Sequence, residues 1–204
     1  KRGVSCWFWM ILLCAGVWGC GVGQGEISEV EGEAREVLLA LLEDRNVDAP
    51  LAAEAALMLG KLSELDVVPA LVAALAHPEE LVVVHAARAL GNLGGDRAIA
   101  ALDSLFQHAE STTLKIETAV ILDKLGQAGK RTWLLETLET APLGIFRSTA
   151  AAALGQVGDL SAIPALRRAF HQDGEEIVRS STALALARLN DRESLPAVAN
   201  RLQE

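Results

Sequence analysis

Apolar residues recur along this chain in five columns with a period of 31 or 32 residues. The most regular column is leucine, which stands at Leu59, Leu90, Leu122, Leu154 and Leu186. An alanine lies three residues before each leucine, at Ala56, Ala87, Ala119, Ala151 and Ala183. The other apolar columns lie eight residues before the leucine and twelve and sixteen residues after it. A period of about 20–50 residues is typical of a solenoid that stacks one structural unit many times.

Within each period the apolar spacing is helical and is interrupted once, so each copy predicts two helices. The first helix of one copy is predicted over about Glu80–Leu93. Residues that end helices in a left-handed conformation follow the first helix of four copies, at Gly94, Gly126, Gly158 and Asn190. Aspartates predicted to cap the next helix come shortly after, at Asp96, Asp159 and Asp191. Prolines suited to the first turn of the second helix stand at Pro69, Pro164 and Pro196.

The sequence therefore predicts an all-α fold of about five helix–turn–helix repeats of 31–32 residues. One pair cannot bury its apolar face alone, so neighbouring pairs must stack. The pattern resembles HEAT repeats, most closely the HEAT-like repeats of the phycobilin-lyase type, in "VVHAARALGNLGGDRAIAAL" and "RSTAAAALGQVGDLSAIPAL". The resemblance covers about Leu51–Glu204, after a half-repeat helix at about Glu33–Leu42, and implies a right-handed α-α solenoid, or superhelix. The third copy departs most, since no glycine follows Leu122 and "QAGKRTWLL" replaces the usual motif.

The N-terminus has the order of a secretory signal, with two basic residues, an apolar run of about 15 residues and then small residues. The predicted divisions are a signal peptide at 1–19, an acidic Gly/Glu tether at 20–32 and the repeat domain at 33–204. "VWGC" resembles a bacterial lipobox, a resemblance that implies that Cys20 becomes the first residue of the mature chain and carries a lipid. The alternatives are ordinary signal cleavage after Gly23, a short membrane anchor that stays attached, and a buried helix. We therefore expect an exported protein that a lipid holds at the cell envelope, facing the periplasm if the source has two membranes.

The charge of the chain and the positions of its cysteines and histidines disfavour several kinds of function. The net charge of −9 disfavours binding to nucleic acid, because such a surface repels phosphates. All three cysteines lie within the first twenty residues, so the repeat region offers no cysteine nucleophile or disulfide. Deoxyhypusine hydroxylases, which are relatives of such repeats, bind iron through His-Glu pairs, but no histidine here has an adjacent glutamate: His77, His85, His108 and His171. We expect no catalytic residue, no metal and no cofactor.

In superhelices of this kind the second helices line the inner, concave face. The positions thirteen, fourteen and seventeen residues after each leucine should point there, and they carry apolar, acidic, basic and neutral side chains in turn. A mixed groove suits a protein or peptide partner, although a solvated face without a ligand is the alternative. Trp133 stands in a column that is otherwise alanine, which indicates either a partner contact or drift of the repeat. The residues predicted to bind the partner are Asp103, Gln107, Trp133, Leu135, Glu136, Glu139, Arg167, Arg168 and His171.

The expected function is a non-catalytic scaffold or adaptor that binds a protein or peptide on its concave face. The alternatives are a subunit of an enzyme complex of the bilin-lyase type and a structural spacer of the envelope. The first residue is Lys rather than Met, which is compatible with a piece of a longer protein. No polar capping repeat is evident at the C-terminal end, so further repeats or self-association through that edge remain open.

Overall fold

A computed structural model describes residues 24–44, 46–62, 65–127 and 129–201 of the chain. Over these ranges the chain forms α-helices and two short 3-10 helices, and it contains no strand. The chain divides into two compact units, residues 1–37 and residues 38–204. The predicted signal peptide at 1–19 and the lipidation site at Cys20 lie outside the described residues.

Helix α2 (Gln24–Glu43) accounts for the described residues of the first unit and continues into the second. The sequence predicted a tether at 20–32 and a helix only from about Glu33. The structure instead has helix from Gln24 onward, so residues 24–32 are helical. The many glutamates of this stretch are good helix formers, which agrees with the earlier start.

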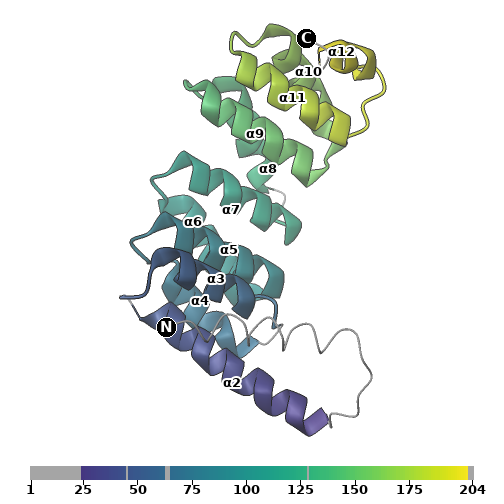
Figure 1. Cartoon of the computed structure of the whole chain (residues 1–204). Helices are drawn as coiled ribbons and strands as arrows, with labels where there is room; N and C mark the ends of the chain where they lie inside the picture. The colour runs from purple at the N-terminus through teal and green to yellow at the C-terminus, as the bar shows by residue number, and fades with distance from the viewer. Residues whose placement is uncertain (1–23, 45, 63–64, 128, 202–204) are drawn as a thin grey trace. The chain divides into compact units, whose positions relative to one another are not determined.

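The second unit consists of helix pairs, as predicted. The first helices of the pairs are α3 (Ala49–Leu59), α5 (Glu80–Leu93), α7 (Thr112–Lys124), α9 (Gly144–Val157) and α11 (Glu176–Arg188). The second helices are α4 (Val68–Ala74), α6 (Asp96–His108), α8 (Gly129–Thr140), α10 (Ile163–Gln172) and α12 (Leu195–Arg201). The 3-10 helices η1 (Leu65–Val67) and η2 (Leu160–Ala162) lead into α4 and α10. Successive first helices pack side by side in a row (Figure 1), which confirms the predicted α-helical solenoid.

The leucine and alanine columns form the core of this unit. All ten of their side chains are at most 2% exposed. The buried residues group into two hydrophobic clusters, one from Leu38 to Leu122 and the other from Ile116 to Leu189. Helix α7 contributes to both clusters, so it is the element that joins the two parts of the core.

The residues that end the first helices all have the positive φ that the prediction requires, although Gly94 has an extended ψ of −158° and is therefore not in the left-handed helical region, as Gly158 is (ψ 13°). Gly94, Gly126, Gly158 and Asn190 all have positive φ, and Asn190 (φ 54°) is the one non-glycine residue to do so in the described ranges. Asp159 accepts a hydrogen bond from the amide of Ser161 (2.9 Å), as a cap should. The prediction for Asp96 is wrong: this residue is the first of α6, Gly95 holds the cap position, and no side-chain cap bond forms.

Glycines after the core leucine allow first helices to approach closely. A Cβ on Gly60 would lie 2.5 Å from the Cα of Ala89, and one on Gly155 would lie 2.9 Å from the Cα of Ala185. Helix α7 departs from this arrangement, because Asp123 stands in the glycine column. Its Ile121 likewise replaces the alanine found at the matching position of α5, α9 and α11. Helix α7 therefore meets its neighbours with larger side chains on both sides.

Candidate functional site

Side chains of α6 and α8 meet in one continuous seam on the second helices. The Phe106 and Trp133 rings pack edge to face, with centroids 5.1 Å apart and an interplanar angle of 87°. The Lys130 ammonium lies 4.3 Å from the centroid of the Phe106 ring and 2.6 Å from the carboxylate of Asp103. Gln107 donates a hydrogen bond to the same carboxylate (2.7 Å). In this seam the aromatic pair of Phe106 and Trp133 contacts the partly exposed ion pair of Lys130 and Asp103.

Trp133 fills space between two repeats as well as bordering the surface. Its side chain is half-buried and packs against the second core cluster and Phe106. The other copies have alanine in this column, so the ring occupies room that those copies do not have. Packing of the ring against Phe106 is a structural reason for the tryptophan, and the part of the side chain that stays exposed is able to contact a partner.

Helices α8 and α10 are joined by charge. Arg168 forms an ion pair with Glu139, and both side chains are about half exposed. Glu136 and His171 are exposed beside them, whereas Leu135 is half-buried and packs on the core. Two of the predicted residues thus satisfy each other, while Glu136 and His171 face solvent.

Arg167 is directed to the following repeat. Its guanidinium binds the carboxylate of Asp191 at 2.5 and 2.8 Å and that of Glu193 at 2.5 Å. The bound guanidinium lowers the pKa of Asp191 to about 2, against the opposing effect of burial. The same two carboxylates raise the pKa of Arg167. Arg167 therefore ties one repeat to the next.

Two more arginines join neighbouring repeats, and sequence reasoning missed both. Arg131 binds Asp123 (2.7 Å) and Asp159 (2.6 Å). The hydroxyl and amide of Ser161, together with Arg131, lower the pKa of Asp159 to about 2. The turn aspartates Asp159 and Asp191 thus each form an ion pair with an arginine of the preceding repeat. The sequence shows the aspartates and the arginines, but it does not show that they pair.

Arg147 makes the third of these ties. It binds the carboxylate of Asp173 (2.8 Å), which lies in the turn before α11, and also that of Glu175 (3.2 Å). Its guanidinium lowers the pKa of Asp173. Glu175 in turn accepts a hydrogen bond from the amide of Gly144 at the start of α9 (3.1 Å). These contacts hold the last repeats in a defined register.

Three of the four histidines take part in hydrogen bonds with the backbone, and the Glu79 amide donates to Nδ1 of His77 (3.1 Å). The Nδ1 atoms of His85 and His108 contact the carbonyls of Ala53 (3.2 Å) and Ser104 (2.8 Å). No group of three or more His, Cys, Asp or Glu side chains converges as a metal site would in the described ranges. A search of the same residues also finds no helix with the length and apolar character needed to cross a bilayer.

Comparison with known proteins agrees with this geometry. A family model described as HEAT repeats matches residues 33–122 and 132–204. The two matched segments are separated by residues 123–131, where the third copy departs from the pattern. A search of the curated proteins found no match to this sequence.

Solved structures with similar helical arrays include two enzymes or enzyme subunits. One is human deoxyhypusine hydroxylase in complex with glycerol. The two sequences are 20% identical, the match covers 78% of this chain and 75% of the hydroxylase chain, and the TM-score is 0.41. Another is the complex of CpcE and CpcF of phycocyanin lyase from Nostoc sp. PCC7120, at 24% identity, with 82% and 68% coverage and a TM-score of 0.54. At these identities the likeness concerns the fold.

Proposed function

This chain belongs to the HEAT-repeat family, and we propose on that basis that it is a non-catalytic scaffold that binds a protein or peptide partner along its second helices. The observation that supports the proposal most is the contrast between two kinds of column. Columns that build the core repeat almost unchanged, whereas the exposed column of α6, α8 and α10, fourteen residues after the core leucine, reads Ser104, Glu136 and Arg168. Such variation is what recognition of an irregular partner requires, since a core needs none of it.

The groups on this face suit a partner with both apolar and charged side chains. The partly buried Trp133 offers an aromatic contact at the surface, and tryptophan is a kind of residue that dominates many interfaces. Gln107, Glu136 and His171 are exposed on α6, α8 and α10, respectively. The arginine ties between repeats limit motion of the array, which reduces the entropy lost when a partner binds.

Cross-linking in living cells followed by mass spectrometry tests this proposal. The variant changes Gln107, Glu136 and His171 together to alanine, and the control changes three exposed residues outside the second helices to alanine: Glu54, Lys61 and Arg188. We expect one abundant cross-linked protein that the second-helix variant loses and the control keeps. Recovery of the chain alone, or equal loss in both variants, would refute a scaffold that uses this face.

We further propose that the chain is exported and is held at the cell envelope through a lipid on Cys20. The basic, apolar and small segments before this cysteine support the proposal. Metabolic labelling with a radioactive fatty acid should mark the wild-type chain, whereas Cys20→Ala should lose the label and move to the soluble fraction. An unlabelled wild-type chain would refute lipid attachment.

A subunit of a bilin-lyase-type complex and an envelope spacer are the alternatives. The similarity to the CpcE–CpcF complex concerns the fold, so it leaves the activity of this chain open. Co-expression with a bilin supply and a phycobiliprotein should produce visible-light absorbance on that protein only if the chain serves a lyase. A spacer would yield neither bound bilin nor a stoichiometric partner.

A further inference from the structure

One position of helix α7 is far more buried than its equivalents in α5 and α11. Val120 on its outward side is 6% exposed. The equivalent position two residues before the core leucine holds Leu184 in α11, which is 52% exposed, and Arg88 in α5, whose side chain is 48% exposed. The same helical position thus lies in a depression on α7 and on the open surface of α5 and α11.

The larger side chains of α7 account for the depression. A methyl group of Ile121 lies 2.4 Å from where a Cβ on Gly91 would stand, so α5 accommodates this isoleucine only because it has glycine there. On the other side, Asp123 replaces the glycine that would let α9 approach, and its carboxylate is drawn to Arg131. Larger groups at a helix contact hold the helices apart, because interiors pack at nearly full density.

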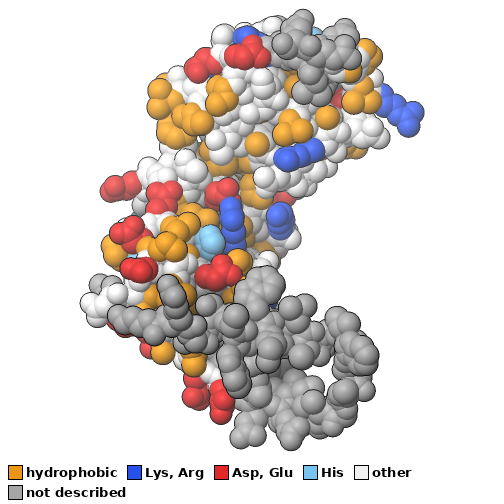
Figure 2. Space-filling model, in the orientation of Figure 1, with side chains coloured by type: hydrophobic (Ala, Val, Ile, Leu, Met, Phe, Trp, Pro, Cys, Tyr) orange, Lys and Arg blue, Asp and Glu red, His pale blue; other side chains and the backbone are white. Residues whose placement is uncertain are grey.

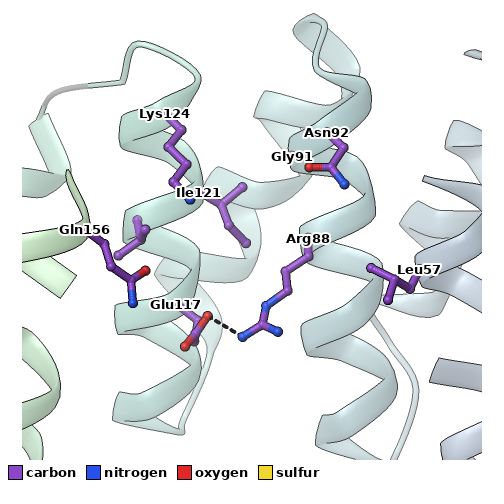
Figure 3. A pocket seen from close by; sticks show the side chains of 9 residues that line it. Leu57, Arg88, Gly91, Asn92, Glu117, Ile121, Lys124 and Gln156 are labelled. Carbon is purple, nitrogen blue, oxygen red and sulfur yellow. Dashed lines mark hydrogen bonds and ion pairs between the residues drawn. The ribbon is translucent and has the colours of Figure 1, made fainter. Parts of the chain in front are cut away.

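The result is a groove of about 330 Å³ over α7, shown in Figure 3. Val120 and Ile121 provide its apolar floor. Arg88 from α5 reaches across it to Glu117 of α7 (3.0 Å), and Gln156 from α9 lines the opposite side. Leu57 from α3 also lines the groove, which therefore draws on four successive first helices and lies apart from the second-helix face proposed above.

The charge of the groove differs in sign from that of the whole chain. It contains Arg88 and Lys124 but only one carboxylate, Glu117, whereas the chain as a whole carries −9. Lys124 is exposed and makes no ion pair with a described residue. Figure 2, which faces the first helices, shows basic side chains over α5 and α7 with acidic ones beside them. An acidic group that approaches the chain would find one of its few attractive sites here.

We propose that the groove over α7 is a second interaction site, which docks an extended acidic segment of a partner protein. A carboxylate of the segment binds Lys124 and shares Arg88 with Glu117, and an adjacent apolar side chain covers Val120 and Ile121. The amide side chains of Asn92 and Gln156 are placed along the groove to bond the backbone of the segment. A volume of about 330 Å³ is at the small end of ligand pockets, which suits a short contact of this kind.

Fluorescence anisotropy with the whole chain tests the site. The probe is a fluorescein-labelled hexapeptide of alternating glutamate and leucine, and the comparison probe replaces each glutamate by lysine. The variant is Lys124→Glu, and the matched control is Arg188→Glu, which makes the same charge reversal at the equivalent position of α11. We expect Lys124→Glu to weaken binding of the acidic probe at least fivefold, and Arg188→Glu to change it less than twofold.

Methyl NMR of the same samples locates the probe. The acidic probe should shift the methyl signals of Leu57, Val120 and Ile121, and it should bind more weakly as salt rises from 50 to 300 mM, as contacts between exposed charges do. Equal effects of the two charge reversals, methyl shifts elsewhere, or equal binding of the lysine probe would overturn the proposal. Stronger competition by anionic vesicles or by double-stranded DNA than by the unlabelled acidic peptide would overturn it as well, in favour of a lipid or nucleic-acid ligand.

Discussion

The close approach of α3 and α5 at Gly60 leads to a sharp prediction, that Gly60→Ala destabilises the chain. Replacing glycine by alanine usually stabilises a protein by about 0.4–1 kcal/mol where the backbone permits it, because the unfolded chain loses freedom. The backbone permits it here, since φ of −66° and ψ of −13° are helical. Conformation alone would thus make Gly60→Ala favourable.

Packing against Ala89 turns this expected gain in the free energy of unfolding into a loss. The new Cβ would lie 2.5 Å from the Cα and 2.6 Å from the Cβ of Ala89, whereas carbon atoms rest about 3.5–4.0 Å apart. The nearest obstacle is backbone, so the two helices must separate by about 1 Å. Overpacking of this kind costs typically about 1–3 kcal/mol. A contact as short as 2.5 Å to backbone belongs in the upper half of that range, about 2–3 kcal/mol, so subtracting the conformational gain leaves an expected loss of about 1–2.6 kcal/mol in the free energy of unfolding.

Urea denaturation followed by circular dichroism measures that loss, and hydrogen exchange locates it. Amides of α3 and α5 should exchange faster in Gly60→Ala, while those of α11 stay protected, because repeats contact only their neighbours. Gly155→Ala should lose less, since its contact is 2.9 Å. Gly32→Ala is the control: it lies within α2 with nothing within 4 Å of the new Cβ, so protection of α2 should rise. A Gly60→Ala chain at least as stable as wild type would refute the reasoning.

Other predictions concern packing, the turns and pH. Trp133→Ala should lower the free energy of unfolding in urea by about 2–4 kcal/mol, because the half-buried ring packs on Phe106, and Trp133→Phe should lose clearly less. Asn190→Gly should raise it by a few tenths to about 1 kcal/mol, since φ is 54° there; an unchanged or lower value would contradict the turn geometry. The pKa values of Asp159 and Asp191 are lowered to about 2, so the stabilisation is present above about pH 4 and is lost as pH falls toward 2. The urea midpoint should fall over that interval, and fall less in Asp191→Asn; an equal fall in this variant would exclude the Arg167 pair as a cause.

Much of the fold could be predicted because its signals are local. Helix α5 has the bounds expected from apolar spacing, since the periodicity of a helix is written in neighbouring residues. The positive φ of Asn190 followed from residue type for the same reason. Asp96 shows the limit: the extra glycine at Gly95 takes the cap position and moves the aspartate into α6, a shift of one residue that counting from the core leucine did not resolve.

The sequence predicted which side of the second helices carries the candidate site, but it did not predict which side chains there are bound to one another. Apolar periodicity placed Glu136, Arg168 and His171 outward on second helices, and they are exposed. It could not tell that Arg167 turns away to Asp191, or that Arg168 is already paired with Glu139, because the partners of these arginines stand 24 and 29 residues distant in sequence.

The sequence by itself determined that this chain is a row of helix pairs, since the spacing, the turn residues and the core columns act within one repeat. Only the tertiary structure decided how unlike side chains from neighbouring repeats meet. Asp123 and Ile121 were visible as departures in the third copy, but their consequence depends on what they face across the helix contact. The recess over α7 and the seam at Trp133 both arise in this way, because the volume available to a side chain is set by the repeats on either side of it.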